Sequence, residues 1–313
     1  MLIVGVLVGS VGKEAELSRR TAAHILAECQ GMDGHEFSIV TVADLLAKKF
    51  KPDTVINIHY GLLGDGGSVP GLLHLMRIPY TGSDGLASSI CRNKILTKHF
   101  GRMVGIDFPD HVVAYHGELV FTQEKIMSEI GLPAILKPID SASSIDVFLA
   151  RDPPELKRAL ESMEGHKSIM AEPFLKGREV TVGVLERGGE LLALPVIGIK
   201  IKNQPYQNFH AKYGEGEMEF VIPAELDDVV SVQVQAMAVK LHRAVGCKGY
   251  SRTDMILSPE GRVKVLEINA FPGIGPYSEF PKAAALLGVS YTELISCLLE
   301  SGKKMYDLQR SAI

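Results

Sequence analysis

A short apolar segment leads directly into a glycine-bounded turn and a helix at the start of the chain, and this order constrains the fold more than any other feature. Residues 2–8 (LIVGVLV) are far fewer than the roughly 20 that a membrane span needs, and the pattern is typical of a buried parallel strand. Gly9 to Gly12 then supply a turn, and residues 14–28 have helical character. A strand–turn–helix start of this kind predicts an open α/β sheet.

Strand-like and helix-like segments continue along the 313 residues, a length that suggests about two domains or three small ones. The predicted strands are residues 37–42, 54–59, 133–138, 168–172, 178–186, 191–199, 249–257 and 263–269, and the predicted helices are residues 85–100, 226–245 and 282–300. The segment 203–218 is polar and aromatic with little periodicity, and it is too long for an ordinary connection. We therefore expect a functional loop there.

Composition and charge exclude several classes of protein. A net charge of −4 offers no basic surface for nucleic acid, and no apolar run could span a membrane, so we expect neither partner. The cysteines, Cys29, Cys91, Cys247 and Cys297, include no C-x-x-C pair, so neither zinc nor a redox dithiol is expected. No basic segment precedes the first apolar run, as it would in a secretory signal. We therefore expect a reduced, cytoplasmic protein.

The turn at Gly9–Lys13 resembles two nucleotide-binding motifs and completes neither. A P-loop would need Gly in place of Leu7 and Ser or Thr in place of Glu14. Val11 and Ala15 break the dinucleotide pattern G-x-G-x-x-G. The simplest interpretation is a tight strand-to-helix turn, although a ligand contact at the helix N-terminus stays open.

The sharpest local pattern is a hairpin that turns around Ser258–Gly261. If the two strands pair symmetrically about this turn, Asp254 faces Glu267 and Arg252 faces Asn269. Side chains alternate along a strand, so all four share one face, and directly opposed Cβ atoms lie about 5 Å apart.

Two carboxylates at this separation repel each other, and a divalent cation between them removes the conflict. Oxygen ligands with open positions suit Mg²⁺, which is commonly bound by one or two carboxylates together with substrate phosphates. Ile256 and Val265 are expected on the same face, which argues against its facing solvent. The alternative is a solvent-facing strand pair in which Arg252 pairs with Asp254.

Lys137 ends an apolar strand and precedes Pro138, so its ammonium needs an anionic partner. Phosphate is the natural partner for such a point charge. The hydroxyl and backbone groups of Ser141–Ser144 offer further donors for phosphate oxygens. The alternative is a lysine whose stem is buried and whose charge reaches solvent.

These pieces, in this order, resemble the D-alanine–D-alanine ligases of the ATP-grasp superfamily over essentially the whole chain. The most specific stretches are residues 78–83 (IPYTGS), residues 246–254 (GCKGYSRTD), and residues 266–269 (LEIN) followed by Pro272-Gly273. The resemblance implies an α/β (α+β) protein of three domains. They are an N-terminal substrate-binding domain (1–85), a central ATP-grasp domain (86–177) and a C-terminal ATP-grasp domain with the metal and catalytic site (178–313).

The resemblance also implies the residues of the site. Those that hold ATP are Lys94, Lys137, Ser144, Glu172, Phe174, Leu175, Glu179 and Lys212. The ligands of two Mg²⁺ ions, with Mn²⁺ as an alternative, are Asp254, Glu267 and Asn269. The catalytic residues are Arg252 and the Gly273 backbone N–H, which stabilise an oxyanion, together with Glu14, Ser143 and Tyr213. The residues that contact the amino-acid substrates are His59, Ser278 and Glu279.

The implied reaction is an ATP-dependent ligation in two steps. The carboxylate of the first amino acid attacks the γ-phosphate and forms an acylphosphate, and the amine of the second then displaces phosphate. Lys212 and Tyr213 belong to a loop that closes over the site and excludes water. The family further implies small amino-acid substrates, a role in peptidoglycan synthesis and a homodimer.

Several positions depart from the family pattern. The phosphate loop has Ser141, Ala142 and Asp146 where Glu, Gly and Gly are usual, and the adenine hinge has Pro173 in place of Lys. These changes restrict the backbone and remove charges beside the nucleotide.

On the substrate side, the usual His-Gly pair is His59-Tyr60-Gly61, and Glu279 replaces an apolar residue. Glu279 could receive a cationic or polar substrate group, or it could face solvent. One hypothesis for the function is therefore a ligase that uses D-alanine as both substrates. The other is a ligase of specialised metabolism that joins different amino acids or closes a ring within one molecule. A carrier that binds nucleotide without catalysis is disfavoured because the metal ligands, Arg252 and both lysines are retained.

Overall fold

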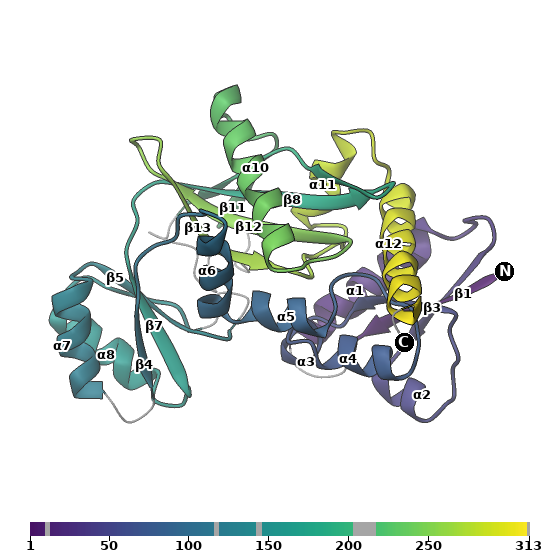
Figure 1. Cartoon of the computed structure of the whole chain (residues 1–313), viewed down its shortest axis with the longest axis horizontal. Helices are drawn as coiled ribbons and strands as arrows, with labels where there is room; N and C mark the ends of the chain where they lie inside the picture. Colours follow the sequence, from purple (N-terminus) through teal and green to yellow (C-terminus); the bar gives the residue numbers. More distant parts are fainter. Residues whose placement is uncertain (10–12, 116–118, 142–145, 203–216, 312–313) are drawn as a thin grey trace.

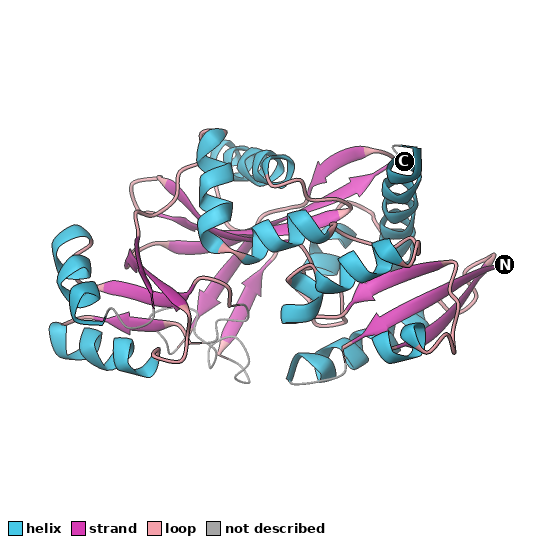
Figure 2. Cartoon of the chain, turned by 60° about the horizontal axis from the view of Figure 1, so that its bottom comes forward, coloured by secondary structure: helices cyan, strands magenta, loops and turns pink. Residues whose placement is uncertain are grey.

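The computed structural model describes residues 1–9, 13–115, 119–141, 146–202 and 217–311. Their strands form three sheets. The N-terminal sheet and the sheet of β4 to β7 lie at opposite ends of an elongated molecule, and the C-terminal sheet lies between them (Figure 1). Figure 2 shows the same three groups of strands with helices packed around them. Within the described residues, no helix is long and apolar enough to cross a membrane.

The N-terminal sheet is the open parallel sheet that the start of the sequence predicts. Its order is β2-β1-β3, and both pairs are parallel. The strands are β1 (Leu2–Val8), β2 (His35–Val40) and β3 (Thr54–Ile58), and the helices are α1 (Lys13–Glu28), α2 (Val42–Leu46), α3 (Leu62–Asp65) and α4 (Ser68–Leu75). Ala22 and Ile25 of α1 are fully buried with Val4 and Val6 of β1, so apolar burial on this sheet fixes the helix that begins beside the site.

The second sheet is antiparallel, with the order β4-β7-β5-β6. Its strands are β4 (Val112–Tyr115), β5 (Ala134–Pro138), β6 (Phe148–Ala150) and β7 (Ser168–Pro173), and its helices are α7 (Leu119–Glu129) and α8 (Pro153–Ser162). It has a core of its own, in which Leu136 of β5 packs with Ile126 of α7 and Leu156 of α8. This small unit carries Lys137 and Glu172 on neighbouring strands.

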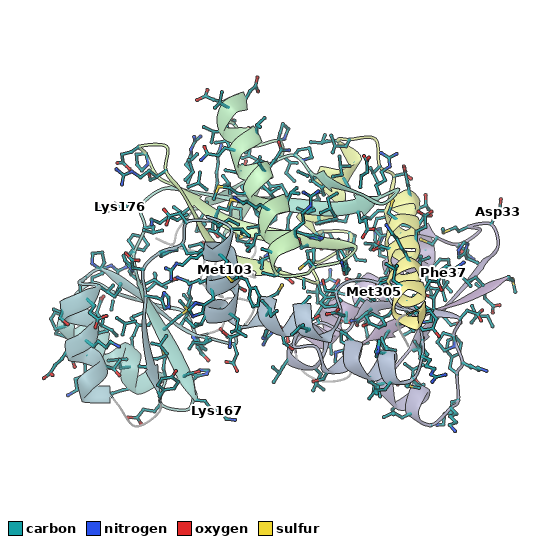
Figure 3. The ribbon with its side chains drawn as sticks, in the orientation of Figure 1. Asp33, Phe37, Met103, Lys167, Lys176 and Met305 are labelled. Atoms are coloured by element: carbon teal, nitrogen blue, oxygen red, sulfur yellow. The ribbon has the colours of Figure 1, made fainter. Side chains whose placement is uncertain are left out.

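The C-terminal sheet has the order β11-β10-β8-β12-β13, and β9 pairs with β8. Its strands are β8 (Arg178–Arg187), β9 (Glu190–Ala193), β10 (Ile197–Ile201), β11 (Met218–Val221), β12 (Tyr250–Leu257) and β13 (Val263–Asn269). The helices that follow or cover it are α10 (Asp228–Ala244), α11 (Glu279–Ala285) and α12 (Tyr291–Ser311). Met305 of α12, labelled in Figure 3, is buried in the same core as Leu7 and Tyr80, so α12 joins this sheet to the N-terminal unit.

Two predicted helices are each divided in the structure. Residues 85–100 form α5 (Gly85–Arg92) and α6 (Lys94–Met103), because Asn93 is extended and its side chain accepts from the N–H groups of Ile95 and Leu96. Residues 282–300 fall on α11 and α12, which are separated by Gly288 at φ +75°. The first break places Lys94 at the first turn of α6, against β13.

Each sheet lies inside one of the three predicted segments, 1–85, 86–177 and 178–313. The helices α5 and α6 belong to the second segment by sequence, yet they pack on β13 of the third. The domain boundaries themselves stay a prediction.

Candidate active site

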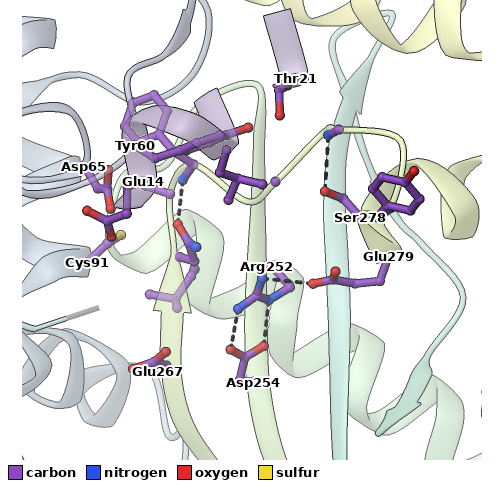
Figure 4. Close-up of a pocket in the computed structure, with 18 of the residues that line it drawn as sticks. Glu14, Thr21, Tyr60, Asp65, Cys91, Arg252, Asp254, Glu267, Ser278 and Glu279 are labelled. Atoms are coloured by element: carbon purple, nitrogen blue, oxygen red, sulfur yellow. Dashed lines mark hydrogen bonds and ion pairs between the residues drawn. The ribbon is translucent and has the colours of Figure 1, made fainter. Parts of the chain in front are cut away.

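Two adjoining pockets contain most of the predicted site residues. The first lies between the start of α1, the end of α3, β12–β13 and the segment 270–279 (Figure 4). The predicted residues that line it are Glu14, Lys94, Arg252, Asp254, Glu267, Asn269, Gly273, Ser278 and Glu279. The second lies between the β4–β7 sheet and the C-terminal sheet, and the predicted residues that line it are Lys94, Lys137, Glu172, Phe174, Leu175, Glu179, Asp254 and Glu267. Ser143, Ser144, Lys212 and Tyr213 lie outside the described residues, as do residues 203–216 of the predicted loop 203–218, whose last residue, Met218, begins β11.

The β12–β13 register at the site is the predicted one. Asp254 pairs with Glu267, and Arg252 pairs with Asn269. The register then shifts between Asp254 and Met255, so that Met255, not Ile256, stands opposite Val265. The prediction that Val265 shares the face of the carboxylates is therefore wrong, because the extra residue of a bulge turns Val265 into the core.

Arg252 lies between two carboxylates. Its Nε and Nη2 each donate to Asp254 at 2.8 Å, and its Nη1 donates to Glu279 Oε1 at 3.0 Å (Figure 4). Burial opposes the charge of Arg252, but Asp254 and Glu279 more than offset it and raise its pKa. Arg252 is 8% exposed and Asp254 is 6% exposed. The alternative of a solvent-facing strand pair is therefore wrong, although the Arg252–Asp254 ion pair that it included is present.

The oxygen atoms of Asp254, Glu267 and Asn269 suit a hard divalent cation. Two carboxylates and an amide oxygen are the kind of ligands that Mg²⁺ takes when phosphates and waters complete its coordination. Asp254 Oδ1 also accepts from Thr181, and Asn269 Oδ1 accepts from the Phe271 N–H at 2.8 Å, which fixes both side chains. Among the described residues no group of three His, Cys, Asp or Glu side chains could hold a metal alone. The three oxygen donors themselves suit an ion whose coordination is completed by phosphates and water.

A buried carboxylate organises the nucleotide side. Glu172 of β7 forms ion pairs with Lys137, at 2.5 Å, and with Lys98 of α6. Burial alone would raise the pKa of Glu172, but the two ammonium groups lower it. Burial lowers the pKa of Lys98 to about 8, and Glu172 opposes that shift.

Sequence reasoning missed Lys98. The signal was present, because Lys94 and Lys98 lie four residues apart on one helix face, and both are buried. Burial lowers the pKa of Lys94, and Glu267, 3.7 Å away, opposes that shift.

The remaining walls of the second pocket suit a planar apolar group. Ile135 and Val147 come from one sheet side, and Ile256 and Leu266 come from the other. Phe174 is held at the end of β7 by its N–H, which donates to the Pro133 carbonyl at 2.9 Å. A flat base between the sheets with anionic groups toward Lys94 and Lys137 matches this arrangement.

Tyr60, the neighbour of the predicted substrate residue His59, lies in the first pocket. The lining of that pocket includes Tyr60 and not His59. The Tyr60 hydroxyl accepts from the Ile274 N–H at 3.4 Å, and burial raises its pKa to about 12. His59 is buried, which lowers its pKa, and its Nδ1 has no hydrogen-bond partner among the described residues. Of the two neighbours, Tyr60 is therefore the one that lines this pocket, and the substrate contact of His59 stays a prediction.

A second acidic group accompanies Glu14. Asp65, at the end of α3, lines the same pocket, and Figure 4 shows its carboxylate beside that of Glu14. Burial raises the pKa of Asp65 to about 7, while Arg92 opposes the shift and Glu14 adds to it. Gly61, at φ +96°, leaves room for Glu14, because a Cβ there would lie 2.4 Å from Glu14 Oε2. Neither Asp65 nor Arg92 was predicted.

The segment after β13 folds tightly beside α11. Ser278 precedes α11, and its Oγ accepts from the Gly275 N–H at 3.2 Å. A Cβ on Gly273 would lie 2.7 Å from Ser278 Oγ, so only glycine lets the backbone pass this close to the serine. Glu279 begins α11 and turns toward Arg252 instead of solvent.

Comparison with known proteins shows relatives over the whole length. The family described as D-ala D-ala ligase C-terminus matches residues 101–300. The D-alanine–D-alanine ligase of Thermotoga sp. is 33% identical over 95% of this chain and 96% of the relative. That of Bordetella petrii is 34% identical over 99% of this chain and 95% of the relative. The crystal structure of the Bacillus anthracis ligase complexed with ATP is 25% identical, with a TM-score of 0.83 over 99% of this chain and 100% of that one.

Proposed function

Because this chain belongs to the D-alanine–D-alanine ligase family, has its ATP-grasp fold and is an ATP-dependent carbon–nitrogen ligase, we propose that it joins two molecules of D-alanine for peptidoglycan synthesis. One observation carries the proposal. The pocket with paired lysines and the pocket with the amino-acid residues share Lys94, Asp254 and Glu267. A phosphoryl group at this junction would meet the nucleotide on one side and a carboxylate on the other.

The proposed reaction has two steps. A carboxylate oxygen of the first D-alanine bonds to the γ-phosphorus as the bond to ADP breaks, which gives an acylphosphate. The amine of the second D-alanine then bonds to the carbonyl carbon, loses a proton, and phosphate leaves. Two Mg²⁺ ions held by Asp254, Glu267 and Asn269 would neutralise charge on the phosphates when bound.

The chain's own residues have distinct proposed roles. Lys94 and Lys137 hold phosphate oxygens. The ion pair with Glu172 fixes the position of the Lys137 ammonium group. Arg252 and the Gly273 N–H stabilise the oxyanion that forms when the amine attacks. Glu14 receives the ammonium of the first amino acid, and Ser278 receives the carboxylate of the second.

Glu279 supports a second candidate function. Its carboxylate lies in the first pocket and is bound to Arg252, so an acceptor with a cationic or hydroxyl-bearing side chain would find a partner there. A ligase with an acceptor other than D-alanine, or one that closes a ring within a single substrate, therefore remains a defined alternative.

The test is a screen for ADP release with D- and L-amino acids, singly and in pairs, with products identified by mass spectrometry. D-alanine alone should release ADP and yield the dipeptide. A different productive pair would replace the substrate assignment, and one compound that yields its own dehydrated product would indicate ring closure. Absence of ADP release with every substrate would contradict the ligase assignment itself.

We also propose that the active form is a homodimer located in the cytoplasm. The family resemblance is the support for the homodimer. The location is proposed because the family's reaction requires ATP, which the cytoplasm supplies. Sedimentation velocity of the purified chain tests the oligomeric state, and a monomer at assay concentration would contradict it.

A further inference from the structure

Arg92, the last residue of α5, spans two parts of the molecule. Its Nη1 donates to Asp65 Oδ2 at 3.2 Å, and its Nε donates to the Asp140 carbonyl at 2.5 Å. The Arg92 and Asp65 side chains are 14% and 16% exposed, so the ion pair is largely shielded from solvent. A guanidinium can make both contacts at once because its donors are fixed in one plane.

The two partners of Arg92 belong to opposite sides of the site. Asp65 ends α3 in the N-terminal unit and lines the first pocket beside Glu14. Asp140 follows β5 in the sheet that carries Lys137. The next carbonyl, that of Ser141, accepts from Lys94 Nζ at 2.6 Å. Arg92 and Lys94 therefore hold two successive carbonyl groups.

The buried Asp65 carboxylate needs the positive charge of Arg92. Asp65 shares its pocket with Glu14, and among the described residues Asp65 Oδ1 is buried without a hydrogen-bond partner. Arg92 is the cation paired with this carboxylate. A buried carboxylate that loses its paired cation is strongly disfavoured, so a change at Asp65 is transmitted to Arg92.

We propose that Arg92 is a positioning residue that couples amino-acid binding at the Glu14–Asp65 side to nucleotide binding at the Lys94 side. The proposal rests on the proposed function, since it requires both ligands. An ammonium group beside Glu14 and Asp65 fixes the Asp65 carboxylate, which fixes Arg92 and the Asp140 carbonyl next to Ser141. The nucleotide then meets the Asp140 and Ser141 carbonyls held in place, and each ligand raises the affinity of the other by the same factor.

The experiment is calorimetric titration of a non-hydrolysable ATP analogue in Mg²⁺, with and without saturating D-alanine. In the wild type, D-alanine should tighten analogue binding by about fivefold or more. In Arg92→Met and in Asp65→Asn this factor should fall to less than about twofold, and the double variant should show no further loss. Arg92→Lys should keep charge but lose one of the two contacts, so its factor should lie between those of the wild type and Arg92→Met.

Arg102→Met is the matched control. Arg102 also donates to a backbone carbonyl, that of Pro109 at 3.3 Å, and lies 3.9 Å from Asp110, yet neither pocket includes it. The factor by which D-alanine tightens analogue binding to Arg102→Met should equal that of the wild type. A merely structural Arg92 would lower analogue affinity equally with and without D-alanine, and that result would overturn the proposal.

Further outcomes separate this inference from the proposed function. Two results contradict the coupling role alone. One is an active wild type in which D-alanine leaves analogue affinity unchanged. The other is a double variant in which the Arg92 and Asp65 substitutions lower the coupling factor independently of each other. A wild type that releases no ADP with any amino acid contradicts the ligase assignment. If Arg92→Met fails to fold, Arg92→Lys and Asp65→Asn carry the same comparison.

Discussion

Glu267 stands directly opposite Asp254 in the β12–β13 pair, and its carboxylate lies 3.7 Å from Lys94 Nζ. The backbone pairing of two core strands sets this placement, since β12 also pairs along its whole length with β8. Both pockets include the two carboxylates, so a change at Glu267 affects the junction between the nucleotide and the amino acid.

Glu267→Gln should lower the rate of ADP formation by at least about a hundredfold while leaving the fold intact. The substitution keeps the size of the side chain and removes only the charge that would hold a cation. Steady-state ADP release in saturating Mg²⁺, with thermal unfolding of the same sample, measures both. Glu190→Gln on the exposed edge of β9 is the control and should behave as the wild type. Normal activity of Glu267→Gln would end the metal assignment.

Glu172→Gln should lower the free energy of unfolding by roughly 3–5 kcal/mol, because it leaves Lys98 and Lys137 without their buried partner. Nucleotide affinity should fall as well, since Lys137 loses its support. Chemical denaturation and analogue titration measure the two effects. Glu155→Gln, which breaks an exposed pair with Arg151, should cost less than about 1 kcal/mol. Equal effects of the two substitutions would show that the Glu172 cluster contributes little.

The stability of the protein should fall as the pH drops from about 6.5 to 4 because of His242. Burial lowers the pKa of this histidine to about 4, and its Nδ1 is 2.7 Å from Ser251 Oγ. In that window the unfolded chain binds a proton that the folded chain does not, so stability present above pH 6.5 is lost at about 1.4 kcal/mol per pH unit. His242→Gln should therefore show a weaker pH dependence than the wild type.

Denaturation of both proteins at several pH values checks this expectation. The advantage of the wild type over His242→Gln should shrink by on the order of 3 kcal/mol between pH 6.5 and 4. His99→Gln, on the exposed side of α6, is the control. A difference that stays constant over this range would show that the proton uptake lies elsewhere.

The features that could be predicted from the sequence are those that local chemistry determines. The alternation of side chains in 250–269 was enough to bring Asp254 opposite Glu267. The bulge at Leu266 of β13, opposite the step from Asp254 to Met255, was not foreseeable, because it depends on how β13 packs in the finished core. Asn93 is a good helix-capping residue, so the break between α5 and α6 had a signal in the sequence, although a single helix over residues 85–100 was predicted.

Contacts between distant parts of the chain could not be predicted from one sequence. The Sγ atoms of Cys91 and Cys247 lie 3.4 Å apart although the residues are 156 positions apart. Motifs based on the spacing of cysteines in sequence cannot predict such a contact. Both thiols are free and buried. The bridge from Asp65 through Arg92 to Asp140 is of the same kind, since it exists only once the first two sheets are placed.

Glu279→Leu should change the choice of acceptor without changing ATP affinity. The sequence left open whether Glu279 faces the substrate or the solvent, and in the structure Glu279 Oε1 accepts from Arg252 Nη1 at 3.0 Å. An acceptor carboxylate held by Ser278 would meet the Glu279 carboxylate beside it, and like charges in a partly buried site repel. Leucine removes the repulsion and frees one face of Arg252, so kcat/KM for D-alanine as acceptor should rise. It should fall for an acceptor with a cationic side chain.

The size of the change follows from the burial of the pair. The side chains of Glu279 and Arg252 are 16% and 10% exposed, so the loss or gain of one charge should shift the acceptor ratio by more than tenfold, where tenfold corresponds to about 1.4 kcal/mol. Competition between D-alanine and a cationic D-amino acid, scored by product mass, measures that ratio. Glu279→Gln is the matched variant, because it keeps an acceptor for Arg252 and removes only the charge. A ratio that moves in Glu279→Leu and stays fixed in Glu279→Gln would assign the effect to the hydrogen bond. An unchanged ratio in both would remove Glu279 from the acceptor site and favour D-alanine as both substrates.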